Sequence, residues 1–145
     1  MSSSFEYDWP DVGYNKDDEE FYNYLKKSDS PSPFSSMRMS DIFIYAMSLG
    51  FKYGIKHEIE SNKRQPNLPP SAFDPDMRWL MRAVAVTDEE NLEIIAEHKK
   101  VIKIAEAYAN GGFSLIRDYM KKQSIEYGAD AVFESELRKV ISELA

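Results

Sequence analysis

The sequence contains two histidines and no cysteine, so the side chains that most often hold metal ions are scarce. His57 and His98 stand far apart, and neither has a second histidine at the spacing of a ligand pair. On a helix, the residues three and four positions from His98 would all be aliphatic, which favours a packed side chain over a ligand. We therefore expect no metal site and no cofactor.

The serines and carboxylates do not form a recognisable catalytic set. Nucleophilic catalysis needs a serine, cysteine or lysine beside a positioned base, and no serine lies in a G-x-S-x-G elbow. Acidic residues such as Asp74 and Asp76 lie where a helix start favours negative charge. Gly111 and Gly112 are not followed by a lysine at phosphate-loop spacing. The sequence therefore predicts no catalytic residues and no enzymatic activity.

Basic residues gather in one part of the chain and are the candidate nucleic-acid contacts: Lys52, Lys56, Lys63 and Arg64. A loop that carries them could contact phosphates, which position a protein on DNA without reading its sequence. Two glutamates, Glu58 and Glu60, lie among them, and mixed charge of this kind is also ordinary for a solvated loop. Both interpretations stay open at this point.

The acidic charge is concentrated at the N-terminal end. The net charge is −7, and residues 1–30 carry eight acidic residues against three lysines. The same end is rich in aromatic residues, in which disordered tails are usually poor. We therefore predict an acidic, aromatic arm over residues 1–33, docked on its own domain or on a partner, and a single helical domain over 34–145. The candidate partner-binding residues of the arm are Phe5, Tyr7, Trp9 and Tyr14.

The expected location of the protein is the cytoplasm. The first ten residues lack the basic and apolar regions of a signal peptide. No apolar run approaches the roughly 20 residues that a membrane-spanning helix needs. The absence of cysteine agrees with a reducing compartment.

The segment Ser40–Gly54 is expected to be the central helix. Ser40 is a suitable N-cap residue, and Asp41 adds negative charge in the first turn. The apolar residues that follow surround most of the helix, which predicts burial. Gly54 suits the left-handed residue that often ends a helix. A buried strand over 42–45 is the alternative, but the apolar pattern runs too long for one.

Residues 55–71 form the least helical part of the sequence. Residues 55–60 alternate apolar and polar side chains, as a short edge strand would. A polar turn and a proline pair follow. We predict either an irregular excursion over 55–71 or a short β-hairpin there, in which residues 66–69 return.

Further helices are predicted from caps and apolar spacing. Asp17–Lys27 is a short helix, and Asp74 followed by Pro75 starts another. Thr87 with Glu90 resembles a capping box that begins the next amphipathic region, either one helix or two broken near 97–99. Asn110-Gly111-Gly112 is expected to end it, with helices over 113–122 and about 130–144 beyond. The predicted fold is mainly α, a compact helical bundle of about five to six helices with the excursion at 55–71.

Two segments resemble a known protein family. The first is A-x-x-L-G-F-K-x-G, and the second is E-x-Y-A-N-G-G. In this chain they comprise Ala46, Leu49, Gly50, Phe51, Lys52 and Gly54, then Glu106, Tyr108, Ala109, Asn110, Gly111 and Gly112. Over residues 33–122 the chain is similar to the Dnd system-associated protein 4 family. That resemblance implies a place in the gene clusters for DNA phosphorothioation and the defence linked to it, and it implies no particular reaction.

Three hypotheses about function follow. The first is a non-enzymatic accessory protein that binds other proteins of the DNA modification and defence system. The second is a DNA-binding protein that contacts phosphates through the basic 52–64 region. The third is a structural homodimer whose N-terminal arm covers the neighbouring subunit.

Overall fold

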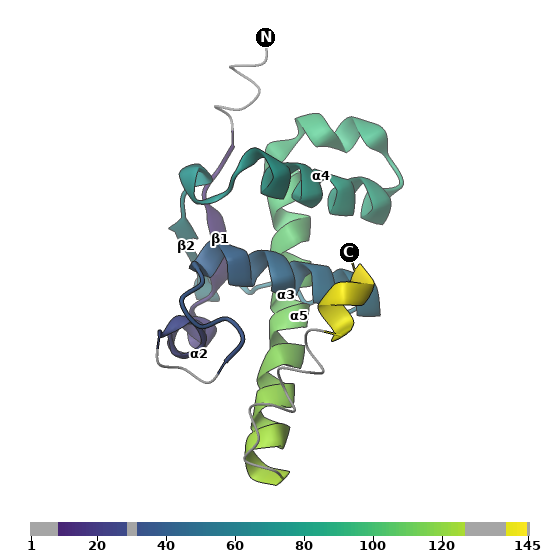
Figure 1. The fold of residues 1–145 in the computed structure, drawn as a ribbon. Helices are drawn as coiled ribbons and strands as arrows, with labels where there is room; N and C mark the ends of the chain where they lie inside the picture. The colour runs from purple at the N-terminus through teal and green to yellow at the C-terminus, as the bar shows by residue number, and fades with distance from the viewer. Residues whose placement is uncertain (1–8, 29–31, 127–138, 145) are drawn as a thin grey trace.

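The computed structural model describes residues 9–28, 32–126 and 139–144, and within them the fold is mainly helical with a two-stranded antiparallel sheet (Figure 1). The elements in chain order are β1 (Val12–Asn15), α2 (Glu19–Lys26), α3 (Met39–Tyr53), β2 (Arg64–Leu68), α4 (Pro75–Glu89), the 3-10 helix η4 (Leu92–Ala96) and α5 (His98–Glu126). A last helical segment covers 139–144. No helix among the described residues is long and apolar enough to cross a membrane.

The central helix is confirmed as a buried element. Ile42, Phe43 and Met47 are almost fully shielded from solvent, and α3 runs across the middle of α5 (Figure 1). Gly54 ends the helix in the left-handed conformation, with φ of 68°. The N-cap differs from the prediction because the helix begins at Met39 and Ser40 lies inside it. Asp41 accepts a hydrogen bond from the backbone N–H of Arg38 at 3.1 Å, and this contact supports the first turn.

The expected helix end at Asn110-Gly111-Gly112 is wrong, because α5 continues through these residues to Glu126. A Cβ atom at Gly112 would overlap the carbonyl oxygen of Ala46, and one at Gly50 would overlap that of Tyr108. Consecutive glycines are usually a helix-stop signal. Here Gly112 lies where α5 crosses α3 at backbone contact and Gly111 lies against the backbone of Ile55, so close packing explains both glycines.

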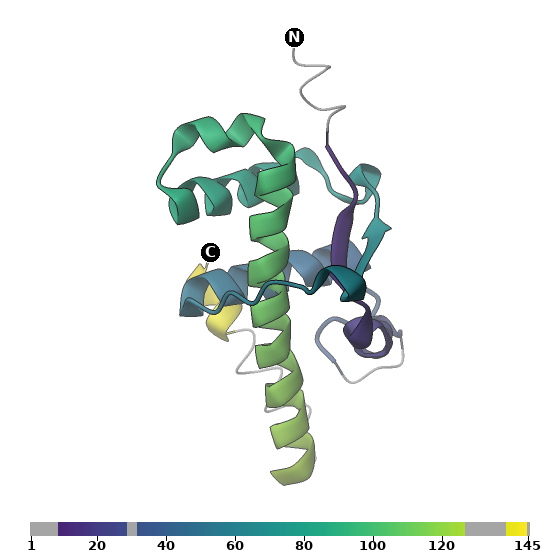
Figure 2. The ribbon, with the colours of Figure 1, turned by 180° about the vertical axis from the view of Figure 1, so that it is seen from behind.

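The excursion is irregular and supplies one strand, so of the two alternatives the local hairpin is wrong. β2 pairs with β1 from the N-terminal arm, with Val12 opposite Leu68 and Asn15 opposite Arg64. Residues 55–60 form no strand and cross α5 (Figure 2). They are held there by backbone bonding, since the N–H of His57 donates to the carbonyl oxygen of Ala107 at 3.0 Å. Local alternation of apolar residues could not reveal that the strand partner lay fifty residues upstream.

The helix start at Asp74 is confirmed, because its carboxylate accepts a hydrogen bond from the N–H of Met77 at 2.9 Å. The capping box at Thr87 is wrong. Thr87 lies inside α4, and its hydroxyl donates to the carbonyl oxygen of Ala83 at 2.9 Å. The short η4 helix ends at Ala96 and the next long helix begins at His98. Of the two alternatives for this region, two helices with a break near 97–99 is therefore correct.

Residues 9–28 of the predicted arm pack into the same core as the rest of the chain. Trp9, Val12 and Leu25 are buried, and the ring of Tyr22 stacks on that of Phe113 at 4.0 Å between centroids. The helix predicted over 17–27 is confirmed as α2, preceded by a turn of 3-10 helix. Of the helix predicted over 130–144, only 139–144 lies within the described residues, and it is helical.

Candidate functional site

A buried carboxylate, Glu106, lies at the centre of the polar contacts between the sheet and α5. Its side chain is 5% exposed. It accepts hydrogen bonds from Arg64 Nε at 2.8 Å and Nη2 at 2.7 Å, and from the backbone N–H of Gly13 at 2.7 Å. Arg64 Nη2 also donates to the carbonyl oxygen of Asp11 at 3.0 Å. One carboxylate on α5 therefore holds both strands of the sheet.

The geometry of this group indicates a structural role. Arg64 presents two N–H groups in the planar, two-pronged arrangement that matches a carboxylate. The hydrogen bond to Glu106 raises the pKa of Arg64, against the opposing effect of burial. A buried carboxylate is stable when its oxygens are occupied in this way. The pair engages Nε and Nη2 of Arg64, the two nitrogens that face Glu106.

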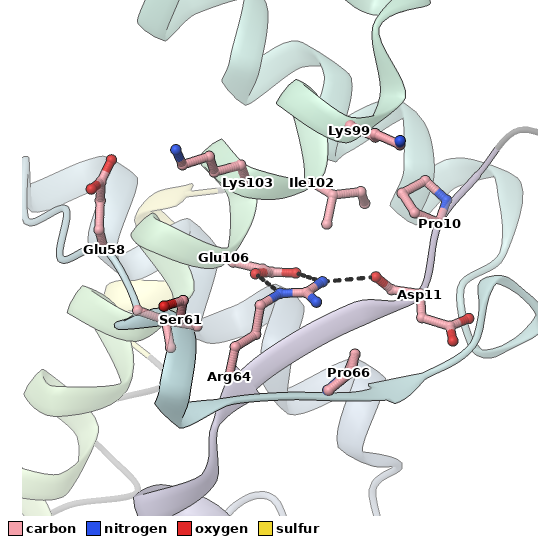
Figure 3. Close-up of a pocket in the computed structure, with 11 residues that line it drawn as sticks. Pro10, Asp11, Glu58, Ser61, Arg64, Pro66, Lys99, Ile102, Lys103 and Glu106 are labelled. Atoms are coloured by element: carbon pink, nitrogen blue, oxygen red, sulfur yellow. Dashed lines mark hydrogen bonds and ion pairs between the residues drawn. The ribbon is translucent and has the colours of Figure 1, made fainter.

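A groove of about 530 Å³ opens above this pair, between α5 on one wall and the sheet on the other (Figure 3). Ile102 and Pro66 provide apolar lining, and the Arg64–Glu106 pair lies at its base (Figure 3). Lys99 and Lys103 come from the α5 wall. Neither lysine forms an ion pair with any carboxylate that the structure describes. They are the cations that the groove leaves available.

A second, smaller hollow of about 240 Å³ lies next to the first and shares Glu58 and Lys103 with it. At its edge Asp88 accepts hydrogen bonds from the Tyr108 hydroxyl at 2.6 Å and from Lys56 Nζ at 3.1 Å. Burial alone would raise the pKa of Asp88, but the donors from Tyr108 and Lys56 outweigh it and lower this pKa. The Asp88 carboxylate is therefore charged and already saturated by donors.

All four candidate nucleic-acid contacts hold a carboxylate. Arg64 pairs with Glu106, and Lys56 pairs with Asp88. The other two pairs are Lys63 with Asp17 and Lys52 with Glu143. The structure does not assemble the four cations into one free basic surface. Lys99 and Lys103 were not singled out from the sequence, although their spacing of four residues on a helix was a usable signal.

Two of the four candidate partner-binding aromatic residues lie within the part of the chain that the structure describes, and both are buried. Phe5 and Tyr7 lie outside the described residues. Trp9 and Tyr14 are 3% and 4% exposed, so within this chain their rings belong to the core. Trp9 packs against the ring of His98 with centroids 4.9 Å apart, which places that histidine in the core as the aliphatic spacing indicates.

Metal binding has no geometric basis in the part of the chain that the structure describes. No group of three or more histidine, aspartate or glutamate side chains there is arranged to hold an ion. His57 is exposed, and its backbone carbonyl accepts a hydrogen bond from Asn110 Nδ2 at 3.0 Å. Its visible role is to attach the 55–60 segment to α5.

Comparison with known protein families gives a match to this chain. The family model described as DNA sulphur modification system-associated protein 4 matches residues 12–137. The chain belongs to this family. The match includes β1 and α2, which the resemblance over 33–122 did not reach, so most of the arm is part of what the family shares. No curated protein and no solved structure matches the chain.

Proposed function

We propose that this protein is a cytoplasmic, non-enzymatic accessory protein that binds other protein components of a DNA sulphur modification and defence system. Membership of the family supplies the setting. The observation that supports this molecular role is the Arg64–Glu106 pair, because Glu106, the most buried charged group that lines the groove, is held by contacts within the fold. A reaction centre would leave such a carboxylate free to exchange protons with a substrate.

The ion pairs favour contact with proteins over contact with DNA. A basic residue that already holds a carboxylate must lose that partner before it can neutralise a phosphate. Lys56 and Arg64 pair with the partly buried carboxylates of Asp88 and Glu106. If either cation moved to a phosphate, its carboxylate would be left charged and without that partner. Binding to other proteins requires no such rearrangement.

The test is affinity purification of the tagged chain from its native host, at low and moderate salt. Proteins encoded with the DNA sulphur modification system should be retained, and a tag-only strain should retain none. Mass spectrometry identifies the retained proteins. If no component of that system is recovered, even after chemical cross-linking in cells, the proposed function is wrong.

Direct contact with DNA is the second candidate, and one observation favours it. Lys99 and Lys103 face the groove without a carboxylate partner among the described residues. Binding of a short duplex should then weaken with salt, because each phosphate contact contributes about 0.9 to the slope of log K against log salt. The double variant Lys99→Ala/Lys103→Ala should lower that slope by about 2.

The control for this experiment is Lys63→Ala, which removes a cation already paired with Asp17 and should leave the slope unchanged. Salt-independent binding, or no binding at all, would exclude phosphate contact through this groove.

A further inference from the structure

The outer face of α4 carries a strip of exposed apolar side chains, Trp79, Leu80 and Ala83, which we call the α4 strip. Trp79 is 51% exposed and Leu80 is 41% exposed. Spacings of three and four residues place the three side chains on one face of the helix. Leu92, on η4 packed against the same helix, is 70% exposed. Large apolar side chains gathered in this way mark an interaction surface when they occur together.

Trp79 is held in place by a column of stacked groups. The Cζ atom of the Arg82 guanidinium lies 4.4 Å from the centroid of the Trp79 ring and 4.8 Å from the centroid of the Trp9 ring. Trp9 in turn packs against His98. Arg82 is 1% exposed, so the inner end of the column is fixed in the core. A tryptophan that is already ordered loses little conformational entropy on binding, which favours it as an anchor.

Acidic side chains lie before and after the strip along the chain, and Arg78 is next to Trp79 in sequence. Asp76 precedes it on the same face, and Glu89, Glu90 and Glu93 follow at the end of α4 and the start of η4. All four are exposed, and none pairs with a basic residue in the described ranges. This composition attracts positive charge to an apolar surface. The ring of Trp79 adds to this attraction, because an aromatic ring attracts cations and Trp79 is 51% exposed.

We propose that the α4 strip binds a cationic amphipathic segment of a partner protein, an inference that rests on the proposed function. Apolar side chains of the segment pack on Trp79 and Leu80. Its lysines or arginines pair with the acidic residues before and after the strip, and one of them packs against the exposed part of the Trp79 ring. A second copy of this chain fits less well, because the chain carries a net charge of −7.

The experiment compares three tagged full-length chains in the native host: wild type, Trp79→Ser/Leu80→Ser, and Tyr53→Ser. Tyr53 is as exposed as Trp79 but lies at the end of α3, so it is the matched control. Circular dichroism of the purified chains confirms that each is folded. The double variant should lose at least ten-fold of the captured system protein, since buried aromatic anchors dominate interface affinity. The control variant should capture it as wild type does.

Two further variants test the charge and the location of the contact. Glu89→Lys/Glu93→Lys alters exposed acids that have no partner in the described chain, so it should weaken capture several-fold without changing the fold. A photo-reactive benzoylphenylalanine in place of Ala83 should cross-link to the partner. Mass spectrometry should then identify a partner peptide that is rich in lysine or arginine and alternates them with apolar residues at helical spacing.

The outcomes separate this inference from the proposed function. If wild type captures system proteins and the Trp79→Ser/Leu80→Ser variant captures them equally well, the α4 strip is not the docking surface, and the proposed function stands. If wild type captures none, the proposed function fails and this inference fails with it. A cross-link from position 83 to an acidic peptide, to a second copy of this chain or to another part of the same molecule overturns the inference.

Discussion

At the scale of single residues, the fold depends on polar groups that lie at the junctions between elements. Glu106 joins α5 to both strands through Arg64 and Gly13. Asp88 receives Tyr108 and Lys56, and Asp18 pairs with Arg117 of α5. Because these carboxylates are largely shielded from water, removing one of their partners would leave a buried charge uncompensated and would destabilise the fold. Arg64 and Lys56, which the sequence offers as nucleic-acid contacts, therefore take part in the assembly of the molecule.

Replacing Glu106 by alanine should destabilise the protein by about 3 kcal/mol, because it leaves Arg64 and the Gly13 N–H without their acceptor. Because Arg64 is about one-third exposed, water can partly solvate its charge, and the loss of stability lies at the lower end of the range for a broken buried ion pair. Urea unfolding followed by circular dichroism measures it. Lys63→Ala, at an exposed pair, is the control and should hardly move the midpoint. Equal midpoints for the two variants would contradict the assigned role.

Two tyrosines should ionise well above the usual pH. Burial and the hydrogen bond to Glu19 raise the pKa of Tyr14 to about 12, and burial and the bond to Asp88 raise that of Tyr108 to about 12. Because the folded-state pKa is raised, their contribution to stability is complete below the unfolded value of about 10 and is lost as pH rises to about 12. Ultraviolet titration of tyrosinate should show this late step, reduced in Tyr14→Phe and in Tyr108→Phe. Complete ionisation near pH 10 while the chain is folded would refute it.

At the scale of elements, the crossing of α3 and α5 determines the arrangement of the molecule (Figure 1). The two backbones meet at glycines, since a side chain at Gly50 or Gly112 would overlap a carbonyl group of the other helix. A side chain at Gly111 would overlap the carbonyl group of Ile55, in the segment that follows α3. Each glycine inside a helix weakens that helix by roughly 1 kcal/mol relative to alanine. Close packing of the two helices offsets this cost and fixes their separation.

Gly112→Ala should therefore destabilise the protein, although alanine is the better helix former. The new methyl group meets the backbone of Ala46, which cannot move aside as a flexible side chain could, so we expect a loss of about 3 kcal/mol. Gly54→Ala is the matched control. A methyl group at position 54 would meet no neighbouring atom, but the positive φ disfavours alanine, so we expect a loss of stability of about 1 kcal/mol. Thermal unfolding of both variants measures the difference, and a stabilised Gly112→Ala would show that the crossing is looser than described.

At the scale of the whole molecule, the described part of the N-terminal arm is built into the core. β1 supplies the only described strand partner of β2, and Tyr22 covers Phe113 of α5. Trp9 closes the space between α4 and the start of α5 by packing on Arg82 and His98. The family match from residue 12 onwards agrees with an arm that belongs to the shared fold.

A fragment beginning at residue 34 should fail to fold on its own. It lacks β1 and α2, so β2 has no strand partner and Phe113 is uncovered. Typical domains have only about 5–15 kcal/mol of stability, and we expect the loss of these two elements to exceed it. Circular dichroism and the dispersion of amide signals in NMR spectra provide the measurement, with the full chain as reference. A cooperative unfolding transition in the 34–145 fragment would show that the arm is an accessory to an independent domain.

The sequence by itself determined the helical class, the buried central helix, the helix start at Asp74, the helix end at Gly54, and the family. These features follow from short-range periodicity and local hydrogen bonding. Tertiary structure alone decided that Gly111 and Gly112 continue a helix, that β2 pairs with β1, and that Arg64 serves Glu106. Each of these outcomes depends on a contact between distant segments, where packing and the pairing of buried charge outweigh the preference of the local sequence.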